Sequence, residues 1–336
     1  GSLIRNLLIN TECLIHNIDK ISYASDFTGI NELVSENNRH FHHKIDLKDK
    51  VKLEEVIKKI CPNLIIHLAA ESHVDRSIEN PFNFIESNIL GTFNLLEVTR
   101  DYWNNLNPEN KDSFRFHHVS TDEVFGTLRD GKFFNESSNY SPRSPYSASK
   151  ASSDHLVQSW HNTYGLPTLI SNCSNNYVPF QFPEKLIPLT INKALSGDKI
   201  PIYGNGNNVR DWLYVDDHVD AIFEIIQKGE NGKNYCIGAN QPLSNLEIVE
   251  KICSLLDVFA PKKFEYKNLI TFVKDRPGHD KRYAIDNNYI KKKIGWKPKY
   301  DIDSGLEKTV KWYLANLKWC EIVMKKGNYI GNRLGI

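Results

Sequence analysis

The stretch FRFHHVSTDEVFG, residues 114–126, decides the fold of this chain. Its first six residues are typical of a buried strand. The strand is predicted to end at Ser120, and Thr121, Asp122 and Glu123 follow it directly. Open α/β sheets bind their ligands at the carboxyl ends of strands. The stretch therefore predicts a central strand whose end carries a hydroxyl group and a pair of acids.

Three further short apolar runs are predicted to be buried strands, and they lie at residues 14–18, 64–68 and 168–173. Longer amphipathic stretches, such as residues 82–100, separate the runs. This alternation is typical of parallel strands joined by crossover helices. The expected fold class is therefore α/β, with a doubly wound parallel sheet of the Rossmann type.

The pattern changes near residue 181, where the elements become shorter and richer in Gly, Pro and Asn. We expect residues 1–180 to form the Rossmann-type domain. Residues 181–320 are expected to form mainly a smaller substrate lobe over the carboxyl edge of the sheet, with some segments that return to the first domain. Residues 321–336 are expected to form a tail.

The N-terminus departs from this plan. A doubly wound nucleotide-binding fold opens with a strand and a glycine-rich turn, whereas residues 1–8, GSLIRNLL, already have helical character. We therefore expect the first strand to be missing and the domain to be truncated. Either Gly1 is the last glycine of a lost turn, which places Asp19 near the ribose-binding position, or Gly1 and Ser2 are a cloning remnant.

The composition excludes several classes of function. The chain has 42 Lys and Arg against 41 Asp and Glu, a net charge of +1, so no overall field attracts nucleic acid or anionic lipid. No apolar run approaches the roughly 20 residues that cross a bilayer. Six widely spaced cysteines fit reduced thiols in the cytoplasm. The histidines at residues 40–43 and 117–118 lack acids or cysteines at ligand spacing, so no metal is expected.

A tyrosine and a lysine follow in PYSASK, residues 145–150. Tyr146 and Lys150 stand one turn apart at the start of a predicted helix, so they share a face. A cation beside a phenol lowers its pKa from about 10, so Tyr146 could remove a hydroxyl proton, shared with Thr121, while a hydride leaves the same carbon. The pair alone also fits an ordinary helix face.

The two acids suggest a second reaction step. Adjacent carboxylates in a cleft titrate apart, so that one of Asp122 and Glu123 stays protonated as an acid while the other acts as a base. The alternative is a helix N-cap followed by an acid that lies in solvent. The strand end and the nearby Tyr146 and Lys150 favour the catalytic interpretation.

Between residues 19 and 312 the chain resembles the dTDP-glucose 4,6-dehydratases, a family of extended short-chain dehydrogenase/reductases. The resemblance depends on ordered motifs, each modest alone: DKISYA at 19–24, HLAAESHVDRS at 67–77, NILGT at 88–92, STDEVFG at 120–126, PYSASK at 145–150, EKLIP at 184–188, YG at 203–204, RDWLYVDDH at 210–218 and DRPGHDKRY at 275–283.

The resemblance implies that the chain binds NAD and dTDP-glucose and forms dTDP-4-keto-6-deoxyglucose. Tyr146, with Lys150 and Thr121, would take the proton of the sugar 4-hydroxyl as the C4 hydride passes to NAD⁺. Glu123 would remove the C5 proton and Asp122 would protonate the leaving 6-hydroxyl, before the hydride returns to C6. Alternatives are a UDP-sugar epimerase or decarboxylase, which would not need Asp122, or a sugar-nucleotide-binding protein without a cofactor.

The resemblance also assigns binding residues and a partner. The expected cofactor residues are Asp19, Lys20, Asp46, Leu68, Ala70, Ser72, Thr92, Tyr146, Lys150 and Cys173. The expected substrate residues are Ser72, Thr121, Asn175, Lys185, Tyr203, Arg210, Asn245, Arg276, His279 and Tyr283. For Arg210 and Arg276 the alternative is a surface salt bridge. The chain is expected to form a homodimer through helices at residues 82–100 and 145–164.

One motif departs from the family pattern. Family members commonly carry NNYGP, whereas residues 175–179 read NNYVP, with Val178 in place of the glycine. A glycine allows positive φ or a close approach of the backbone, and a β-branched valine tolerates neither easily. We therefore expect Val178 to perturb the loop that carries Asn175.

Overall fold

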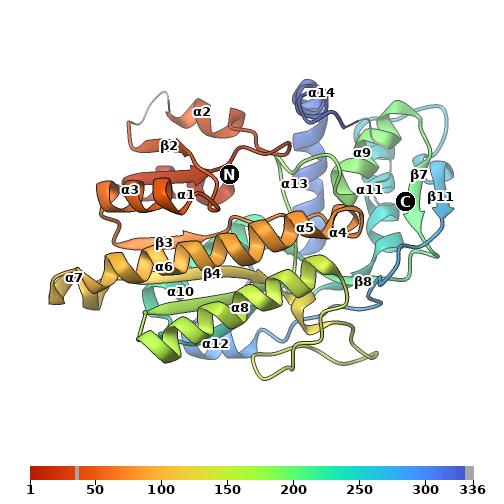
Figure 1. Cartoon of the computed structure of the whole chain (residues 1–336). Helices are drawn as coiled ribbons and strands as arrows, with labels where there is room; N and C mark the ends of the chain where they lie inside the picture. Colours follow the sequence, from red (N-terminus) through yellow and green to blue (C-terminus); the bar gives the residue numbers. More distant parts are fainter. Residues whose placement is uncertain (35–37, 330–336) are drawn as a thin grey trace.

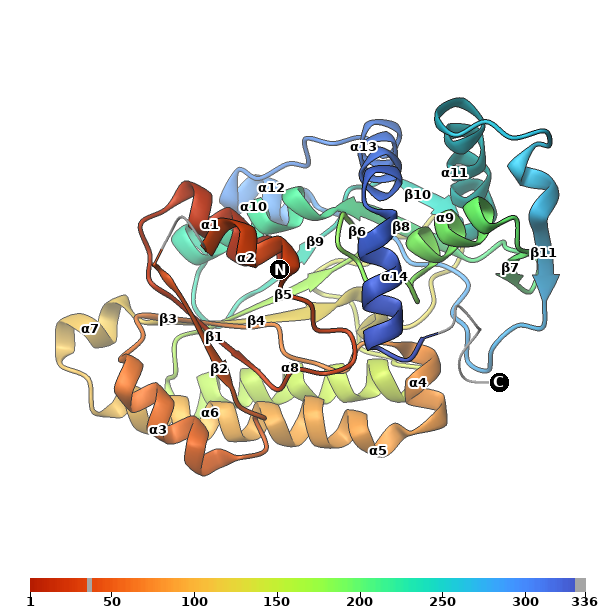
Figure 2. The ribbon, with the colours of Figure 1, turned by 90° about the horizontal axis from the view of Figure 1, so that it is seen from above.

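A parallel sheet with helices on both faces forms the larger part of the molecule (Figure 1 and Figure 2). The structure is a computed structural model, and it describes residues 1–34 and 38–329. A smaller lobe lies at the right of Figure 1, beside the sheet. The predicted α/β class with a doubly wound parallel sheet is confirmed.

Four parallel strands form the main ladder, in the order β3–β4–β5–β9. Their bounds are β3 (Leu64–His67), β4 (Arg115–Thr121), β5 (Thr168–Cys173) and β9 (Asn234–Ile237). Three of them match predicted strands, although β4 continues as far as Thr121. Leu68, expected inside a strand, lies beyond the end of β3 and is exposed. Thr121 pairs with Cys173, so the carboxyl ends of the central strands meet at one edge.

A second, two-stranded parallel ladder contains β1 (Ile15–Asp19) and β2 (His40–Lys44). Within the described ranges no ladder pairing joins β1 to β3. Leu14, expected inside a buried strand, precedes β1 and is exposed, because the connection from the N-terminal helix runs along the surface there. That helix, α1 (Ser2–Asn10), confirms the helical character predicted for residues 1–8.

Helices cover the two faces of the main ladder (Figure 2). On one face lie α3 (Lys50–Ile60), α6 (Gly91–Asn104) and α8 (Pro145–Tyr164). On the other lie α1, α10 (Val215–Lys228) and α12 (Asn288–Ile294). Leu96, Phe116 and Val157 are fully buried in the core of the first face, and Leu3 and Ile222 pack together on the second.

Local signals fix helix α8, which has the bounds that the sequence predicts. The Ser144 side chain accepts a hydrogen bond from the backbone N–H of Ser147, whose own side chain accepts from the N–H of Ser144. Pro145 occupies the first turn, where its missing N–H costs nothing. Gly165 ends the helix in the left-handed conformation at φ 74°. These signals set the register in which Tyr146 and Lys150 face the strand ends.

The smaller lobe contains a sheet in the order β10–β8–β6 and a parallel pair, β11–β7. Its elements are β6 (Asn175–Tyr177), β7 (Ile200–Tyr203), β8 (Val209–Tyr214), β10 (Pro242–Ser244), β11 (Ile270–Val273), α9 (Leu186–Ser196), α11 (Asn245–Phe259) and α13 (Ile302–Ala315). Ile191, Ile252 and Leu306 lie in its core with no exposed surface. Strand β9 and helix α12, although late in the chain, pack on the main sheet.

Helix α14 (Leu317–Lys326) crosses the boundary at residue 321 where the tail is predicted to begin. Trp319, Cys320 and Val323 are buried. The Trp319 Nε1–H donates to Asp26 Oδ2 at 2.9 Å, which ties this helix to the loop after β1. The described part of the predicted tail is therefore a packed helix, and residues 330–336 lie outside the described residues.

Short elements complete the chain. They are α2 (Thr28–Val34), α4 (Val74–Glu79), α5 (Pro81–Phe84), α7 (Pro108–Ser113), a π-helical segment (Ile85–Leu90) and 3-10 helices at Asp122–Phe125 and Tyr266–Leu269. The π-helical segment joins α5 to α6, so the amphipathic stretch at residues 82–100 is one helical arm. A search of the described residues finds no helix with the length and apolarity needed to span a membrane. The six cysteines are free thiols.

Candidate active site

The end of β4 turns sharply into the candidate site. The Thr121 side chain accepts a hydrogen bond from the backbone N–H of Glu123 at 3.3 Å and caps the 3-10 helix that carries both acids. Gly126 ends this turn at φ 80°, and a Cβ there would lie 2.3 Å from the carbonyl oxygen of Ser141. A side chain at that position would displace the turn, so Gly126 fixes where Asp122 and Glu123 point.

The two acids have different environments. Asp122 is fully buried, and burial, with the charges of Glu123 and Asp211, raises its pKa well above its usual range. Its Oδ2 has no hydrogen-bond partner in the protein. Burial also raises the pKa of Glu123, but the charges of Arg276, Arg210 and Lys185 oppose this shift. Thr121 therefore does cap a short helix, as the alternative interpretation of this segment expected. The acid that follows it, Asp122, is buried and does not lie in solvent.

Tyr146 lies at the same edge and is almost fully buried. Burial and the charge of Glu123 raise the pKa of its phenol well above 10, while a hydrogen bond with Thr121 lowers it. The predicted lowering of this pKa by Lys150 is not observed, because burial dominates the shift and the Lys150 ammonium is engaged by other groups. Its Nζ donates to the carbonyl of Val119 at 3.0 Å and lies 3.2 Å from His118 Nε2.

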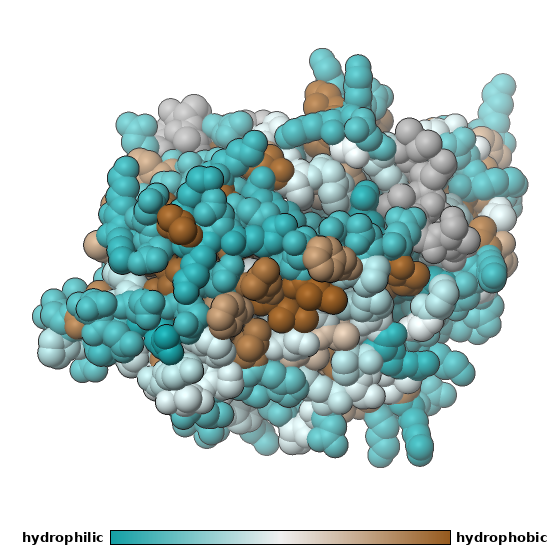
Figure 3. Space-filling model, in the orientation of Figure 1, coloured by the Kyte–Doolittle hydropathy of each residue, from teal (hydrophilic) through white to brown (hydrophobic). Residues whose placement is uncertain are grey.

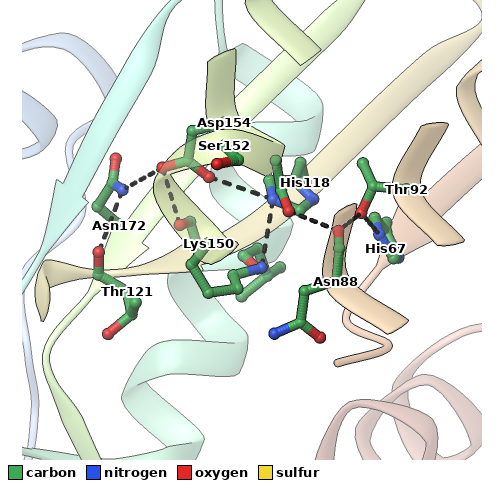
Figure 4. A network of polar contacts seen from close by, with 12 residues as sticks. His67, Asn88, Thr92, His118, Thr121, Lys150, Ser152, Asp154 and Asn172 are labelled. Carbon is green, nitrogen blue, oxygen red and sulfur yellow. Dashed lines mark hydrogen bonds and ion pairs between the residues drawn. The ribbon is translucent and has the colours of Figure 1, made fainter. Parts of the chain in front are cut away.

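A network of buried polar side chains surrounds Lys150 (Figure 4). His118 Nε2 also lies 3.2 Å from Asp154 Oδ1. Asp154 Oδ2 accepts hydrogen bonds from Ser120 Oγ, Tyr140 OH and Asn172 Nδ2 at 2.8, 2.8 and 3.0 Å. Burial lowers the pKa of Lys150, and the Asp154 carboxylate opposes that shift.

Five predicted cofactor residues line one pocket of about 200 Å³ between the two ladders: Asp19, Lys20, Asp46, Leu68 and Ala70. Asp19 Oδ1 accepts hydrogen bonds from the Ile21 N–H at 2.6 Å and from Ser25 Oγ at 3.3 Å. In the described part of the chain no protein group donates to Asp19 Oδ2. This oxygen is therefore available to a hydroxyl group of a ligand.

The other predicted cofactor residues lie outside this pocket. Thr92 is buried, and its hydroxyl donates to the carbonyl of Asn88 at 2.6 Å. Ser72 is exposed, and its carbonyl accepts from Lys185 Nζ at 3.1 Å. Cys173 ends β5, where burial raises the pKa of its thiol to about 12. Their cofactor roles stay predictions.

Several predicted substrate residues gather around buried acids of the lobe boundary. Arg276 donates to Asp75 Oδ1 at 2.9 Å, and Tyr203 OH donates to Asp75 Oδ2 at 2.5 Å. Arg210 is buried and donates to the carbonyls of Val209 and Asp280 at 2.7 and 3.1 Å. A surface salt bridge is therefore wrong for Arg210, and the partner of Arg276 is buried rather than at the surface.

The remaining predicted substrate residues lie nearby or on adjoining elements. The Arg210 guanidinium stacks 4.2 Å above the Tyr283 ring, and His279 Nδ1 lies 2.7 Å from Asp275. Asn175 belongs to β6, and its side-chain oxygen is buried without a hydrogen-bond partner. Asn245 begins α11, and its N–H donates to Asn208 O.

Val178 does not require the conformation of a glycine. It is absent from the residues with positive φ, whereas Phe180, two positions later, has φ 65°. The carbonyl of Val178 accepts a hydrogen bond from Tyr313 OH at 3.3 Å. The loop takes its left-handed turn at Phe180, so the strain expected at Val178 is not present.

Sequence reasoning missed four polar residues that support the site. Asp75 binds Arg276 and Tyr203, and Glu184 accepts hydrogen bonds from Tyr23 OH and Arg76 Nε at 2.8 and 3.2 Å. Both acids belong to family motifs, which could have drawn attention to them. His118 and Asp154 stand 36 positions apart and gave no local signal. No cluster of three potential metal ligands occurs in the described ranges.

Comparisons with known proteins agree with this geometry. The family model of GDP-mannose 4,6 dehydratase matches residues 1–309. The dTDP-glucose 4,6-dehydratase of Shigella flexneri is 49% identical over 98% of this chain and 93% of its own length. A solved dTDP-glucose 4,6-dehydratase of Streptomyces venezuelae with NAD and TYD bound is 36% identical, covers 96% of this chain and 95% of its own, and superposes with a TM-score of 0.86.

An epimerase structure is more distant. The UDP-glucose 4-epimerase of Thermus thermophilus in complex with NAD is 26% identical, covers 94% of this chain and 96% of its own, and has a TM-score of 0.80. The fold is thus shared with epimerases, while the sequence is closer to dehydratases. The motif resemblance is confirmed, and the chain belongs to the nucleotide-sugar 4,6-dehydratase family, in which its close relatives are dTDP-glucose 4,6-dehydratases.

Proposed function

We propose that this chain is a dTDP-glucose 4,6-dehydratase, a hydro-lyase that uses NAD to convert dTDP-glucose into dTDP-4-keto-6-deoxyglucose. One observation carries the proposal: Asp122 and Glu123 lie beside Tyr146 at the end of β4, and the pKa of Asp122 is well above its usual range. An epimerase needs the tyrosine but has no use for a protonated acid that releases water.

The adenosine end of NAD fits the pocket between the ladders. Asp19 and Asp46 line it, and Asp19 Oδ2 is available to accept from a ribose hydroxyl. We assign Lys20, Leu68, Ala70, Ser72, Thr92 and Cys173 to the remaining length of the cofactor. Bound NAD⁺ supplies the acceptor that takes the C4 hydride and later returns it to C6. No described residue is assigned to the pyrophosphate.

Tyr146 acts in the first step, oxidation at C4. The Thr121 hydroxyl is close enough to lower the pKa of the Tyr146 phenol, so we assign both groups to the sugar 4-hydroxyl. Burial and the Glu123 charge keep Tyr146 protonated in this structure. It becomes a base when positive charge from Lys150 and the oxidised nicotinamide offsets them. Tyr146 then takes the 4-hydroxyl proton as the hydride leaves.

Asp122 and Glu123 divide the second step. The C4 ketone acidifies the C5 proton, which Glu123 removes. Asp122 gives its proton to the 6-hydroxyl, which leaves as water. The pKa values have the order this requires, because Asp122 is shifted well above its usual range, whereas three cations limit the shift of Glu123.

The cationic groups near Glu123 suit a nucleotide diphosphate. Lys185, Arg210 and Arg276 all act on the Glu123 carboxylate, so the three cations lie near the acid pair. We assign the diphosphate to these three. The nucleoside and sugar contacts are assigned to Ser72, Asn175, Tyr203, Asn245, His279 and Tyr283. This places substrate mainly on residues 181–320 and cofactor mainly on residues 1–180.

A direct assay tests the proposal. The purified chain is incubated with dTDP-glucose and NAD⁺, and the products are analysed by mass spectrometry. We expect a 4-keto-6-deoxy sugar nucleotide, lighter than the substrate by one water. UDP-glucose is the parallel substrate. An epimer of unchanged mass would support the epimerase alternative, and binding without any product would support a catalytically silent protein.

We further propose that the chain is a homodimer. Phe82, Ile85, Leu90 and Phe93 are exposed along the α5–α6 arm, where Figure 3 shows apolar side chains gathered on one face. An apolar patch of this kind marks a contact surface.

Phe82→Glu should produce a monomer in analytical ultracentrifugation. Phe272→Glu is the control, because Phe272 lies on β11 with a similar exposure of 55% against 61%. An unchanged Phe82 variant would contradict this interface.

The six free cysteines support a cytoplasmic location, because reducing compartments keep thiols unpaired. Fractionation of cells that produce the protein, followed by immunodetection, tests the location. Recovery outside the cytosolic fraction would contradict it.

A further inference from the structure

Two fully buried side chains, His118 on β4 and Asp154 on α8, connect the catalytic groups but have no role in the steps above. His118 Nε2 lies 3.2 Å from Lys150 Nζ and also 3.2 Å from Asp154 Oδ1. The three groups therefore form a chain of cation, imidazole and carboxylate inside the protein (Figure 4). A buried ammonium is costly unless an anion compensates it.

Asp154 also holds the end of strand β4. Its Oδ2 accepts from Ser120 Oγ and from Asn172 Nδ2, and the same Asn172 amide donates to the carbonyl of Thr121 at 3.3 Å. Ser120 and Thr121 are the last two residues of β4. One carboxylate thus fixes the strand end that carries the Thr121 hydroxyl, and its charge also acts on the ammonium of Lys150.

The His118 ring lies between these two groups and stays neutral. Burial, followed by the Lys150 cation, lowers the pKa of His118 to about 4. Its Nε2 can accept from the ammonium, or it can carry a proton and donate to Asp154, but it cannot do both. The loss of either neighbour therefore changes the contact that His118 makes with the other.

The charges around Lys150 leave Asp154 as its compensating anion. The titratable groups that face it are His67 on β3, His118 on β4, Cys173 on β5 and Asp154 on α8. The two histidines are neutral, and the pKa of the Cys173 thiol is about 12. Among these described groups only Asp154 is negatively charged at neutral pH.

We propose that His118 and Asp154 are positioning residues for the oxidative step: together they hold the Lys150 ammonium behind Tyr146 and lock the end of β4. The inference deepens the proposed function and rests on it for its kinetic part. Its electrostatic part concerns Lys150 alone and can be measured without substrate.

The first experiment follows the titration of Lys150 by NMR with isotope-labelled lysine in the wild-type chain and in Asp154→Asn. The amide of Asn keeps the size of the side chain but not its charge. We expect Lys150 to lose its proton at lower pH in the variant, because the compensating anion is gone. Identical titration in both proteins would overturn the proposal, whatever the enzyme does with dTDP-glucose.

The second experiment measures hydride transfer from dTDP-glucose to NAD⁺ in single turnovers, from the absorbance of the reduced nicotinamide. We expect His118→Leu to slow this step about 10- to 100-fold, within the range that a misplaced catalytic group costs. His118→Gln should restore most of the rate, because its amide can still accept from Lys150. A Gln variant as slow as the Leu variant would contradict a positioning role.

The matched control is His117→Leu. His117 is the neighbouring buried histidine on β4, and its Nε2 lies 2.9 Å from Ser171 Oγ instead of near Lys150. We expect a comparable fall in Tm for the two Leu variants but slow hydride transfer in His118→Leu alone. Equal slowing in both would show that damage to β4 explains the effect, and would overturn the proposal. Absence of hydride transfer in the wild type would instead refute the proposed function.

Discussion

The two ladders of the sheet are built differently. Phe116, His117 and His118 of β4 have no exposed surface, whereas Phe41 of β2 is 43% exposed. The main ladder has strands on both sides of β4 and carries the groups assigned to chemistry. The β1–β2 ladder is hydrogen-bonded to no other strand in the described ranges, and it borders the pocket that we propose for the adenosine end of NAD. Rate and cofactor affinity should therefore respond to changes in different parts of the molecule.

The polar groups of the two regions are also satisfied in different ways. In the main ladder several of them bind one another inside the protein, as Asp154 Oδ2 does with Ser120, Tyr140 and Asn172. Beside the pocket, Asp19 holds only its own loop and keeps one oxygen available. A rigid network suits proton transfer, where small displacements are costly, and an open carboxylate suits a ligand that must leave.

The largest effect should come from Asp122→Asn in the main ladder. Loss of a general acid costs about 10²- to 10⁴-fold in rate, so kcat for dehydration should fall by that much. Oxidation at C4 should continue, because Tyr146, Thr121 and Lys150 are intact. Mass spectrometry of quenched reactions and the absorbance of reduced nicotinamide measure the two steps. Asp130→Asn, at an exposed loop position, is the control. A variant with wild-type kcat would remove Asp122 from the mechanism.

The same variant should be more stable than the wild type at neutral pH. The folded-state pKa of Asp122 is raised, so the folded chain keeps a proton that the unfolded chain releases above about pH 4. Ionisation of the unfolded chain thus favours unfolding as pH rises. Asn cannot ionise, so the Tm advantage of Asp122→Asn should be absent below about pH 4 and grow above it. A variant that melts lower than the wild type at pH 7 would contradict this.

Asp19→Ala should affect the other region, with the next largest effect. A hydrogen bond to a charged group contributes about 1.5–3 kcal/mol, which corresponds to a loss of about 10- to 100-fold in NAD affinity. Isothermal titration calorimetry measures the affinity, and kcat at saturating NAD should stay near the wild-type value. Glu12→Gln serves as control because Glu12 lies in solvent near the same ladder. A fall in kcat with unchanged NAD affinity would contradict the expectation that this region controls cofactor binding rather than rate.

Helix α14 should influence cofactor affinity at a distance. Trp319→Phe keeps the ring packing but removes the hydrogen bond to Asp26, whose carboxylate also accepts from the N–H of Thr28. We expect a loss of about 1 kcal/mol in stability and a few-fold weaker binding of NAD, because the loop after Asp19 is less restrained. Trp103→Phe, which removes an equivalent bond to the Lys111 carbonyl far from the pocket, should lower Tm without changing NAD affinity.

Local signals made much of this architecture predictable from sequence. Helix α8 has its predicted ends because Ser144, Pro145 and Gly165 define them within a few residues of chain. The acid pair was predicted because it follows a strand directly. The parts that sequence did not reveal depend on contacts between distant segments. Asp154 meets Ser120 across 34 positions, and no pattern within α8 indicates it.

The pKa of Tyr146 is a second property that local sequence spacing did not predict. A lysine one turn away predicted a lowered pKa, but the Lys150 ammonium contacts His118 and Val119, and burial dominates the phenol. The sequence spacing gives the shared helix face correctly. It does not give the direction of a long, flexible side chain, which depends on the acceptors that a neighbouring strand presents.

Val178→Gly should have the smallest effect, at a loop that packs between the segment after β1 and the smaller lobe. Phe180 in this loop packs against Gly29 beyond β1 and against Trp312 of the lobe, and it supplies the positive φ itself. Glycine at 178 therefore relieves no strain, and it adds backbone freedom that costs about 0.5–1 kcal/mol on folding.

We expect the Val178→Gly variant to have a slightly lower Tm in thermal melts. Its kcat and NAD affinity should stay within about twofold of the wild type, a change of under about 0.5 kcal/mol. Ala at position 178 is the control, because it shortens the side chain without freeing the backbone. A glycine variant with a higher kcat than both the wild type and the alanine variant would mean that Val178 does restrict the loop carrying Asn175, and that the substrate side of the site depends on this loop.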